Sequence, residues 1–144
     1  MIRLEEITPD NWRLGLSVAE NQKSFVSNDM KLLARAYAYR NYRSKAFIIY
    51  SDASPVGMAL YHDCDDFNAY DFSQLFIDER YQGNGYGTDA AKQILDLMKM
   101  DKKYQKVILC YIEGNDRARK MYEKLGFQLT GDRDEDEIIM QLNF

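Results

Sequence analysis

The chain has 144 residues, of which 46% are apolar, 29% charged and 13% aromatic, and its net charge is −4 at pH 7. These values argue against disorder and fit one globular domain with a single core, spanning residues 1–144. Two cysteines and one histidine lack the spacing of a metal site, so no metal is expected. The acidic balance argues against a nucleic-acid partner. No run of about 20 apolar residues and no apolar leader occur, which predicts no membrane association and a cytoplasmic location.

The first half of the chain alternates strand and helix patterns. Residues 2–7 alternate apolar and polar side chains and predict a strand. Thr8-Pro9 offers a capping hydroxyl followed by proline, which predicts a helix that carries Trp12 and Leu16 on one side. A second helix is expected after Asn28 or Asp29, because both residues are good N-caps.

A hairpin and a strand–turn–helix unit follow. Residues 45–50 and 56–62 predict the two strands of a hairpin. Residues 70–78 predict another strand, the glycine-rich stretch 82–87 predicts a turn, and residues 85–100 predict a long helix. The Asp63–Asp66 cluster is interpreted as a solvated hairpin end. His62 is expected at the surface or at a strand end and is given no role.

The last third of the chain predicts three strands and a short helix. Residues 107–112 form an unbroken apolar run, which is typical of a strand covered on both faces. Residues 116–125 predict a helix that Gly126 ends, and residues 127–130 and 138–142 predict the final two strands. The fold class is therefore α/β with a mixed sheet, in the order β-α-α-β-β-β-α-β-α-β-β.

The glycine-rich turn is a candidate anion site. A strand, a glycine-rich turn and a helix start leave several backbone N–H groups free to bind phosphate. A Walker A loop requires Gly-Lys-Ser/Thr, which is absent, and Gly83, Gly85 and Gly87 do not match the Gly-x-Gly-x-x-Gly of a dinucleotide loop. The remaining pattern, Gln/Arg-x-x-Gly-x-Gly/Ala, matches residues 82–87.

With that loop and the later pattern Asn115, Ala118, Tyr122 and Gly126-Phe127, the sequence resembles the GCN5-related N-acetyltransferases (GNAT). The resemblance implies acetyl-CoA as the cofactor, held between splayed fourth and fifth strands, and direct attack of an amine on the thioester. It assigns cofactor binding to the end of the fourth strand, the loop and the segment after the fifth strand: Phe76, Ile77, Gln82, Gly83, Asn84, Gly85, Tyr86, Gly87, Thr88, Asn115 and Tyr122.

The resemblance also implies how protons move during the reaction. Tyr122 occupies the position of the family's general acid, and a phenol with a pKa of about 10 is protonated at neutral pH. An alkylammonium also has a pKa of about 10, so the site must lower that pKa or accept a proton. The family's glutamate on the fourth strand is missing. Asp71, Glu20 or a chain of water molecules are the alternatives for the base.

The N-terminal segments resemble bacterial spermine/spermidine (diamine) acetyltransferases at residues 8–12, 18–22 and 25–26. The implied acceptor is a small polyamine or diamine. Its binding is assigned to carboxylates, an amide and aromatic walls: Glu20, Phe25, Asp29, Tyr37, Asp71 and Gln74. Another amine (a protein N-terminus, a lysine or a drug) and a catalytically silent CoA sensor stay open as alternatives. The resemblance is compatible with a homodimer, which is common in the family.

Overall fold

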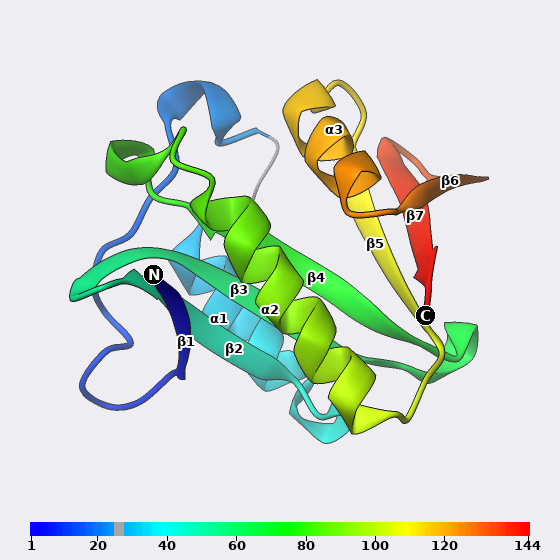
Figure 1. The fold of residues 1–144 in the computed structure, drawn as a ribbon, viewed down its shortest axis with the longest axis horizontal. Helices are drawn as coiled ribbons and strands as arrows, with labels where there is room; N and C mark the ends of the chain where they lie inside the picture. The colour runs from blue at the N-terminus through cyan, green and yellow to red at the C-terminus, as the bar shows by residue number, and fades with distance from the viewer. Residues whose placement is uncertain (25–27) are drawn as a thin grey trace.

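A seven-stranded sheet organises the protein (Figure 1). The computed structural model describes residues 1–24 and 28–144. In space the strands follow the order β1-β2-β3-β4-β5-β7-β6. The elements are β1 (Ile2–Glu6), α1 (Asp29–Ala38), β2 (Lys45–Ser51), β3 (Ser54–Cys64), β4 (Ala69–Ile77), α2 (Tyr86–Asp101), β5 (Lys106–Ile112), α3 (Asp116–Lys124), β6 (Gln128–Asp134) and β7 (Glu137–Asn143). The α/β class and the chain order of the strands are confirmed. None of the described helices is long and apolar enough to cross a membrane.

The segment before α1 differs from its prediction. The helix expected after Thr8-Pro9 is absent; residues 9–13 form turns, and a single 3₁₀ turn follows at Glu20–Gln22. The side chain of Asn11 explains the difference, since its Oδ1 accepts from the Thr8 N–H at 2.7 Å and its Nδ2 donates to the Glu6 carbonyl at 3.0 Å. Such local side-chain bonds compete with helix formation. Gly15, at φ +70°, then turns the chain.

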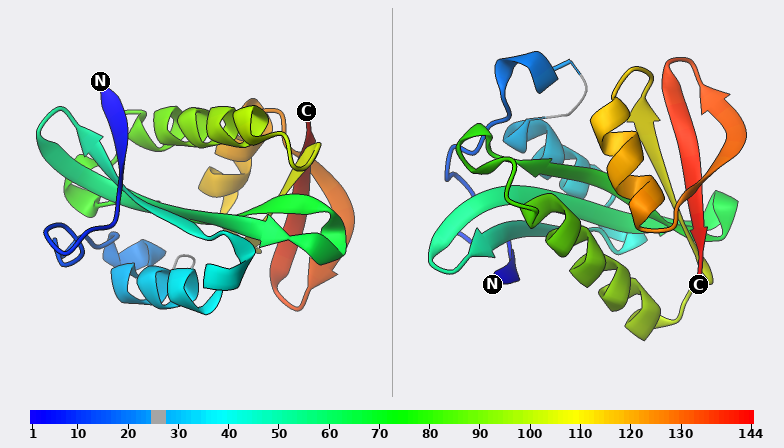
Figure 2. Two further views of the ribbon diagram at one scale, coloured as in Figure 1. Left: turned by 90° about the horizontal axis from the view of Figure 1, so that it is seen from below. Right: turned by 45° about the horizontal axis from the view of Figure 1, so that its top comes forward.

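Helices cover both faces of the sheet (Figure 2). Alternate residues of a strand face opposite sides, and in β2 Ile48 packs with α1 whereas Phe47 and Ile49 pack on the other side. Leu32 of α1 belongs to the same hydrophobic cluster as Ile48. The cluster on the opposite face includes side chains of both α2 and α3. The sheet is therefore the middle layer of three.

The junction between β4 and β5 is the least regular part of the sheet. These strands run parallel and pair only at Tyr70↔Val107 and Asp71↔Ile108. Both strands continue well beyond this point, but they diverge (Figure 1). A register shift between β3 and β4 leaves Ser73 opposite no residue, as in a β-bulge, which bends the strand. The predicted splay of the fourth and fifth strands is confirmed.

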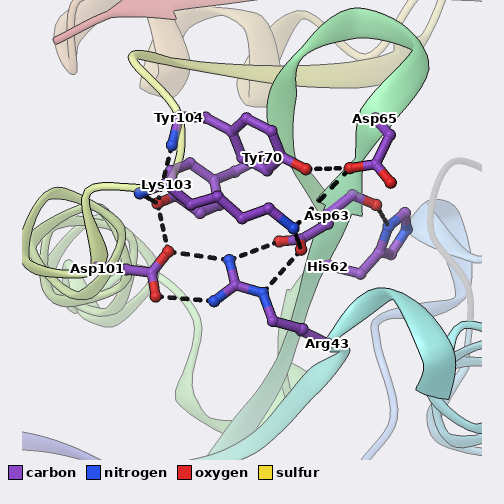
Figure 3. Close-up of polar contacts among 8 residues, drawn as sticks. All are labelled: Arg43, His62, Asp63, Asp65, Tyr70, Asp101, Lys103 and Tyr104. Atoms are coloured by element: carbon purple, nitrogen blue, oxygen red, sulfur yellow. Dashed lines mark hydrogen bonds and ion pairs between the residues drawn. The ribbon is translucent and has the colours of Figure 1, made fainter.

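A polar cluster around Arg43 connects β3, β4 and the end of α2 near the point where β4 still pairs with β5 (Figure 3). Arg43 donates two hydrogen bonds to Asp63 of β3, at 2.7 and 2.9 Å, and two to Asp101 of α2, both at 2.9 Å. Tyr70 of β4 donates to Asp101 at 2.6 Å, and Lys103 donates to Asp63 at 2.7 Å. The prediction of a solvated hairpin end is wrong for Asp63, whose residue is only 3% exposed because these cations cover it.

Replacing Arg43 with Gln should lower the free energy of unfolding by about 2 kcal/mol at neutral pH, because the buried Asp63 would lose one of its two charged donors and Asp101 would lose its guanidinium partner. The Arg43 guanidinium and the Tyr70 hydroxyl hold the pKa of Asp101 far below its ordinary value of 3.8. This stabilisation is complete above that ordinary value and is lost as the pH falls below it. Urea unfolding should therefore show a smaller difference between variant and parent near pH 3. An equal difference at both pH values, or an equal loss in the exposed control Arg40→Gln, would contradict this account.

Candidate active site

A cavity of about 510 Å³ opens where β4 and β5 separate. Its walls are the last residues of β4, the glycine loop with the first turn of α2, the end of β5, and α3. Residues of α1, of β7 and of the N-terminal segment between Val18 and Ser24 complete the lining. This volume lies in the range of small-molecule sites. The cavity therefore follows directly from the limited pairing of the two strands.

The wall formed by β4 offers unpaired backbone groups. From Phe72 to Ile77 this strand pairs with β3 on one side, but it has no described strand partner on the side facing β5. Gly57 permits the close approach of β3, because a Cβ there would lie 2.2 Å from the Phe76 carbonyl oxygen. Free N–H and C=O groups along an extended strand can bind an amide-containing chain, as another strand would.

Asp78 fixes the end of β4 before the loop. Its residue is 1% exposed, and its carboxylate accepts from the backbone N–H groups of Ser17 (2.9 Å) and Arg80 (3.0 Å) and from the Arg80 side chain (2.8 Å). Burial acts to raise the pKa of Asp78, but these hydrogen bonds outweigh burial and hold the pKa below its ordinary value. The carboxylate thus stays ionised and anchors the loop to the N-terminal segment.

The loop presents an anion site at the start of α2. Gly83 and Gly85 have φ values of +84° and +79°, a region that disfavours side chains with a Cβ. Gly85 precedes the helix without any side-chain cap, and the Asp89 N–H donates to its carbonyl. The backbone N–H groups of residues 85–88 come before this first helical bond and have no acceptor within the helix. They and the helix dipole favour a phosphate.

Two amide side chains shape this loop from within. The Gln82 side chain donates to the Ile77 carbonyl at 2.9 Å and to Gln22 at 2.7 Å. Asn84 donates to the Tyr81 carbonyl at 2.9 Å and does not border the cavity. All the other residues assigned to the cofactor from the sequence do border it. Their binding role stays a prediction.

The α3 wall carries Asn115 and Tyr122. Asn115 caps α3 by accepting from the Ala118 N–H at 3.3 Å. Tyr122 is 9% exposed, borders the cavity and packs edge-on against Phe72 and Phe127, with ring centroids 6.3 and 5.7 Å away. Burial raises the pKa of the Tyr122 phenol above its ordinary value of 10. The hydroxyl is therefore protonated at physiological pH, as a proton donor must be.

Asp71 brings a carboxylate to the same cavity. It is the last residue of β4 that pairs with β5, and its side chain is 20% exposed. Burial raises the pKa of Asp71, whereas His62, when it is protonated, and Arg35 act to lower it through their positive charges. His62 lies opposite Asp71 near the end of β3 and is 2% exposed, so the prediction of a surface histidine is wrong, whereas the alternative of a strand-end position holds.

The structure brings only part of the predicted acceptor site together. Asp71 and Gln74 border the cavity, whereas Asp29 and Tyr37 of α1 do not, and Tyr37 is 68% exposed. The Glu20 side chain is 88% exposed and pairs with Lys23 at 2.7 Å, also outside the lining. Phe25 lies outside the described residues. Of the two residues considered as the base, Asp71 is thus the one at the cavity.

Several charged groups in the lining were not anticipated. The cations are Lys23, Lys31, Arg35 and Arg117, and Glu137 of β7 adds a second carboxylate. Arg117 lies in the first turn of α3 and donates to Gln82 at 3.4 Å, so it belongs to the loop end of the cavity. The spacing of Lys31 and Arg35, four residues apart, was a signal that both share one face of α1. Glu137 gave no local signal.

Comparison with known proteins agrees with this geometry. The model of the acetyltransferase (GNAT) family matches residues 6–127. A spermine/spermidine N(1)-acetyltransferase of Bacillus subtilis (strain 168) is 30% identical over 141 residues, which cover 92% of this chain and 91% of that protein. A probable spermine N(1)-acetyltransferase of Bacillus subtilis subsp. natto is 29% identical over the same shares of both chains.

Solved structures show the same fold. The spermidine N-acetyltransferase of Vibrio cholerae, in complex with CoA and spermine, has a TM-score of 0.78 at 18% identity, over 99% of this chain and 95% of that one. An aminoglycoside acetyltransferase in complex with coenzyme A has a TM-score of 0.81 at 15% identity, over the same shares. The chain belongs to the GNAT family and is an acetyl-CoA-dependent N-acetyltransferase. The expectations of family, reaction class and cofactor are thereby confirmed.

The residues present suit this cofactor. The free strand edge of β4 can pair with the amides of a pantetheine arm, and the loop N–H groups can bind a pyrophosphate. Lys23 and Arg117 add positive charge to the cavity wall. The donor set therefore matches a long, extended ligand with one strongly anionic end.

Replacing Gly83 with Ala should weaken the binding of CoA by about tenfold, since the added methyl enters the open space beside the loop N–H groups. Gly131→Ala is a matched control, because Gly131 has a similar φ of +88° and equally open surroundings but lies on exposed β6. Both variants should lose about 1 kcal/mol of stability from backbone strain. Calorimetric titration with CoA and thermal unfolding measure the two effects. Equal CoA affinities for the two variants would contradict the assigned loop site.

Proposed function

We propose that the protein acetylates a primary amine of a small polyamine or diamine. The observation that carries the proposal is a cavity that joins the candidate anion-binding loop to the partly buried carboxylate of Asp71. The approximately 30% identity to Bacillus proteins named for spermine and spermidine supports the choice of acceptor. A flexible polycation needs carboxylates for its ammonium groups, and Asp71 and Glu137 both border the cavity.

The chain's own residues supply binding, orientation and proton transfer. When bound, acetyl-CoA supplies an acetyl group as a thioester, which is reactive toward amines. The loop N–H groups hold the phosphates, and the free edge of β4 orients the arm along the cavity. Asp71 accepts the proton that the attacking nitrogen must lose, and Tyr122 supplies the proton that the departing sulfur must gain.

Burial suits Asp71 to the role of base. A carboxylate with an ordinary pKa is a weak acceptor for the proton of an alkylammonium, whose pKa is about 10. Burial raises the pKa of Asp71 and so brings it closer to that of the amine. Glu20 lacks this advantage, because its side chain is exposed and already paired with Lys23.

A second acceptor class is favoured by the cations on α1. Lys31 and Arg35 both border the cavity, and either could bind an anionic group of the acceptor. An amino acid or a peptide N-terminus carries an amine together with a carboxylate or polar backbone and fits this charge pattern. The polyamine remains the first proposal because the relatives that match nearly the whole chain are named for it.

Release of free thiol from acetyl-CoA, measured against a panel of amines, tests the acceptor. Spermidine and spermine should give kcat/KM values at least about tenfold above a lysine peptide and free amino acids, a difference of about 1.4 kcal/mol. Preference for an amine that carries a carboxylate would instead support the second class. No release with any amine, together with tight CoA binding, would support the CoA sensor.

Replacing Tyr122 with Phe should lower kcat by about 10²-fold or more while leaving CoA affinity unchanged, because only the proton donor is removed. Tyr42→Phe, an exposed tyrosine outside the cavity wall, should retain full activity. Since burial raises the pKa of Tyr122, its ionisation should not reduce the parent's activity below about pH 10. Parent-like turnover in Tyr122→Phe would refute its role as the acid.

A further inference from the structure

His62 is buried in a defined protonation geometry. Its ring stacks on Tyr39, with centroids 4.1 Å apart and planes inclined by 16°. Its Nδ1 lies 2.8 Å from the backbone oxygen of Asp63. A carbonyl oxygen only accepts hydrogen bonds, so Nδ1 must carry the hydrogen. In the neutral ring, Nε2 therefore holds a lone pair and acts as an acceptor.

Nε2 of His62 faces a carboxylate oxygen of Asp71, which is also a hydrogen-bond acceptor. His62 and Asp71 are directly opposed in the β3–β4 register, and Nε2 lies 3.8 Å from Oδ2 of Asp71. Among the side chains that the structure describes, no group donates to this buried Nε2. A lone pair and a carboxylate oxygen at this separation lack the proton that would join them. One added proton would satisfy both groups with a small rotation of the Asp71 side chain.

We propose that His62 and Asp71 form a proton-accepting dyad, in which Asp71 takes the proton of the amine and His62 holds it. The inference rests on the proposed acetyl transfer. The N–H bond of the amine breaks, its electron pair remains on nitrogen for the new bond to the acetyl carbon, and the proton ends between Oδ2 and Nε2. The dyad changes its net charge from −1 to 0. His62 does not border the cavity, so it is a positioning residue that acts through Asp71.

Among the groups around the dyad described next, none competes with it as a proton acceptor. Arg35 of α1 opposes proton uptake by Asp71, and its Nε donates to Ser73 at 2.5 Å. From β5, Cys110 borders the cavity as a neutral thiol, because partial desolvation there raises its pKa to about 11. Burial likewise raises the pKa of Cys64 on β3.

The negative charge of Asp63, on the same strand as His62, is already neutralised by ion pairs. Asp63, which follows His62, is paired with both Arg43 and Lys103 at 2.7 Å. Tyr39 contributes its ring face to the imidazole. Arg35 is therefore the charge that the dyad must overcome, and burial of Asp71 acts against it.

The first test reads the imidazole directly and needs no enzyme activity. His62 is the sole histidine of the chain, so ¹⁵N NMR of a protein without a histidine tag gives one imidazole spin system. The neutral ring should be the Nδ1–H tautomer, because Nδ1 faces the Asp63 carbonyl. In Asp71→Asn the ¹⁵N chemical shift of Nε2 should change, because the carboxylate that Nε2 faces is gone. An Nε2–H tautomer, or an Nε2 shift unchanged by Asp71→Asn, would overturn the dyad.

The second test asks whether the dyad serves the reaction. His62→Gln should lower kcat about tenfold and move the acid limb of the kcat/KM profile about one unit lower, since Asp71 alone holds a proton less well. Affinity for CoA should not change. Tyr39→Leu removes the stacked ring but keeps the imidazole, so it should lower the unfolding temperature and leave the acid limb in place.

The outcomes separate the two proposals. A His62→Gln profile that superposes on that of the parent would overturn the role of His62 in catalysis. A shift of the acid limb in Tyr39→Leu equal to that in His62→Gln would reduce His62 to a packing role. If the parent acetylates no amine, the proposed function and the catalytic role of His62 fail together. The ¹⁵N NMR comparison of the parent with Asp71→Asn still decides whether His62 and Asp71 share a proton.

Discussion

The parallel pairing of β4 with β5 stops after two residue pairs, and the active site depends on this limit. Continuous pairing would satisfy the inner backbone groups of β4 and leave no cavity. Early divergence frees those groups and opens the space that the loop, α2 and α3 surround. The Arg43 cluster closes the other end, because it links β3, β4 and the end of α2 where the strands still meet. The polar cluster and the cavity therefore lie at opposite ends of one strand pair.

Burial raises the pKa of two ionisable groups in this cavity, and the consequence differs between them. It raises the pKa of the Tyr122 phenol, which keeps the proton on a group that must donate one. It raises the pKa of the Asp71 carboxyl, which makes a group that must accept a proton more basic. The same burial therefore suits a phenol to donate a proton and a carboxylate to accept one. In the proposed dyad, His62 would hold the accepted proton without entering the cavity.

Local signals in the sequence predicted the parts of the fold that local chemistry decides. The glycine loop could be recognised because backbone conformation and free N–H groups follow from a few adjacent residues. The helix expected after Thr8-Pro9 failed because the Asn11 side chain binds the same backbone that a helix would use. His62 was misplaced because its burial depends on Tyr39 and on its register with Asp71, neither of which is local. Glu137 reaches the cavity through the pairing of β7 with β5, which sequence spacing does not reveal.

Amide NMR during a titration with CoA would show whether the gap between β4 and β5 is the cofactor site. Saturable shifts are expected at the end of β4, in residues 83–88 and at the end of β5. Weak or absent shifts are expected at the depression formed by Leu4, Phe47 and Gln93. Saturable shifts confined to that depression, or to β6, would show that CoA does not bind in the gap.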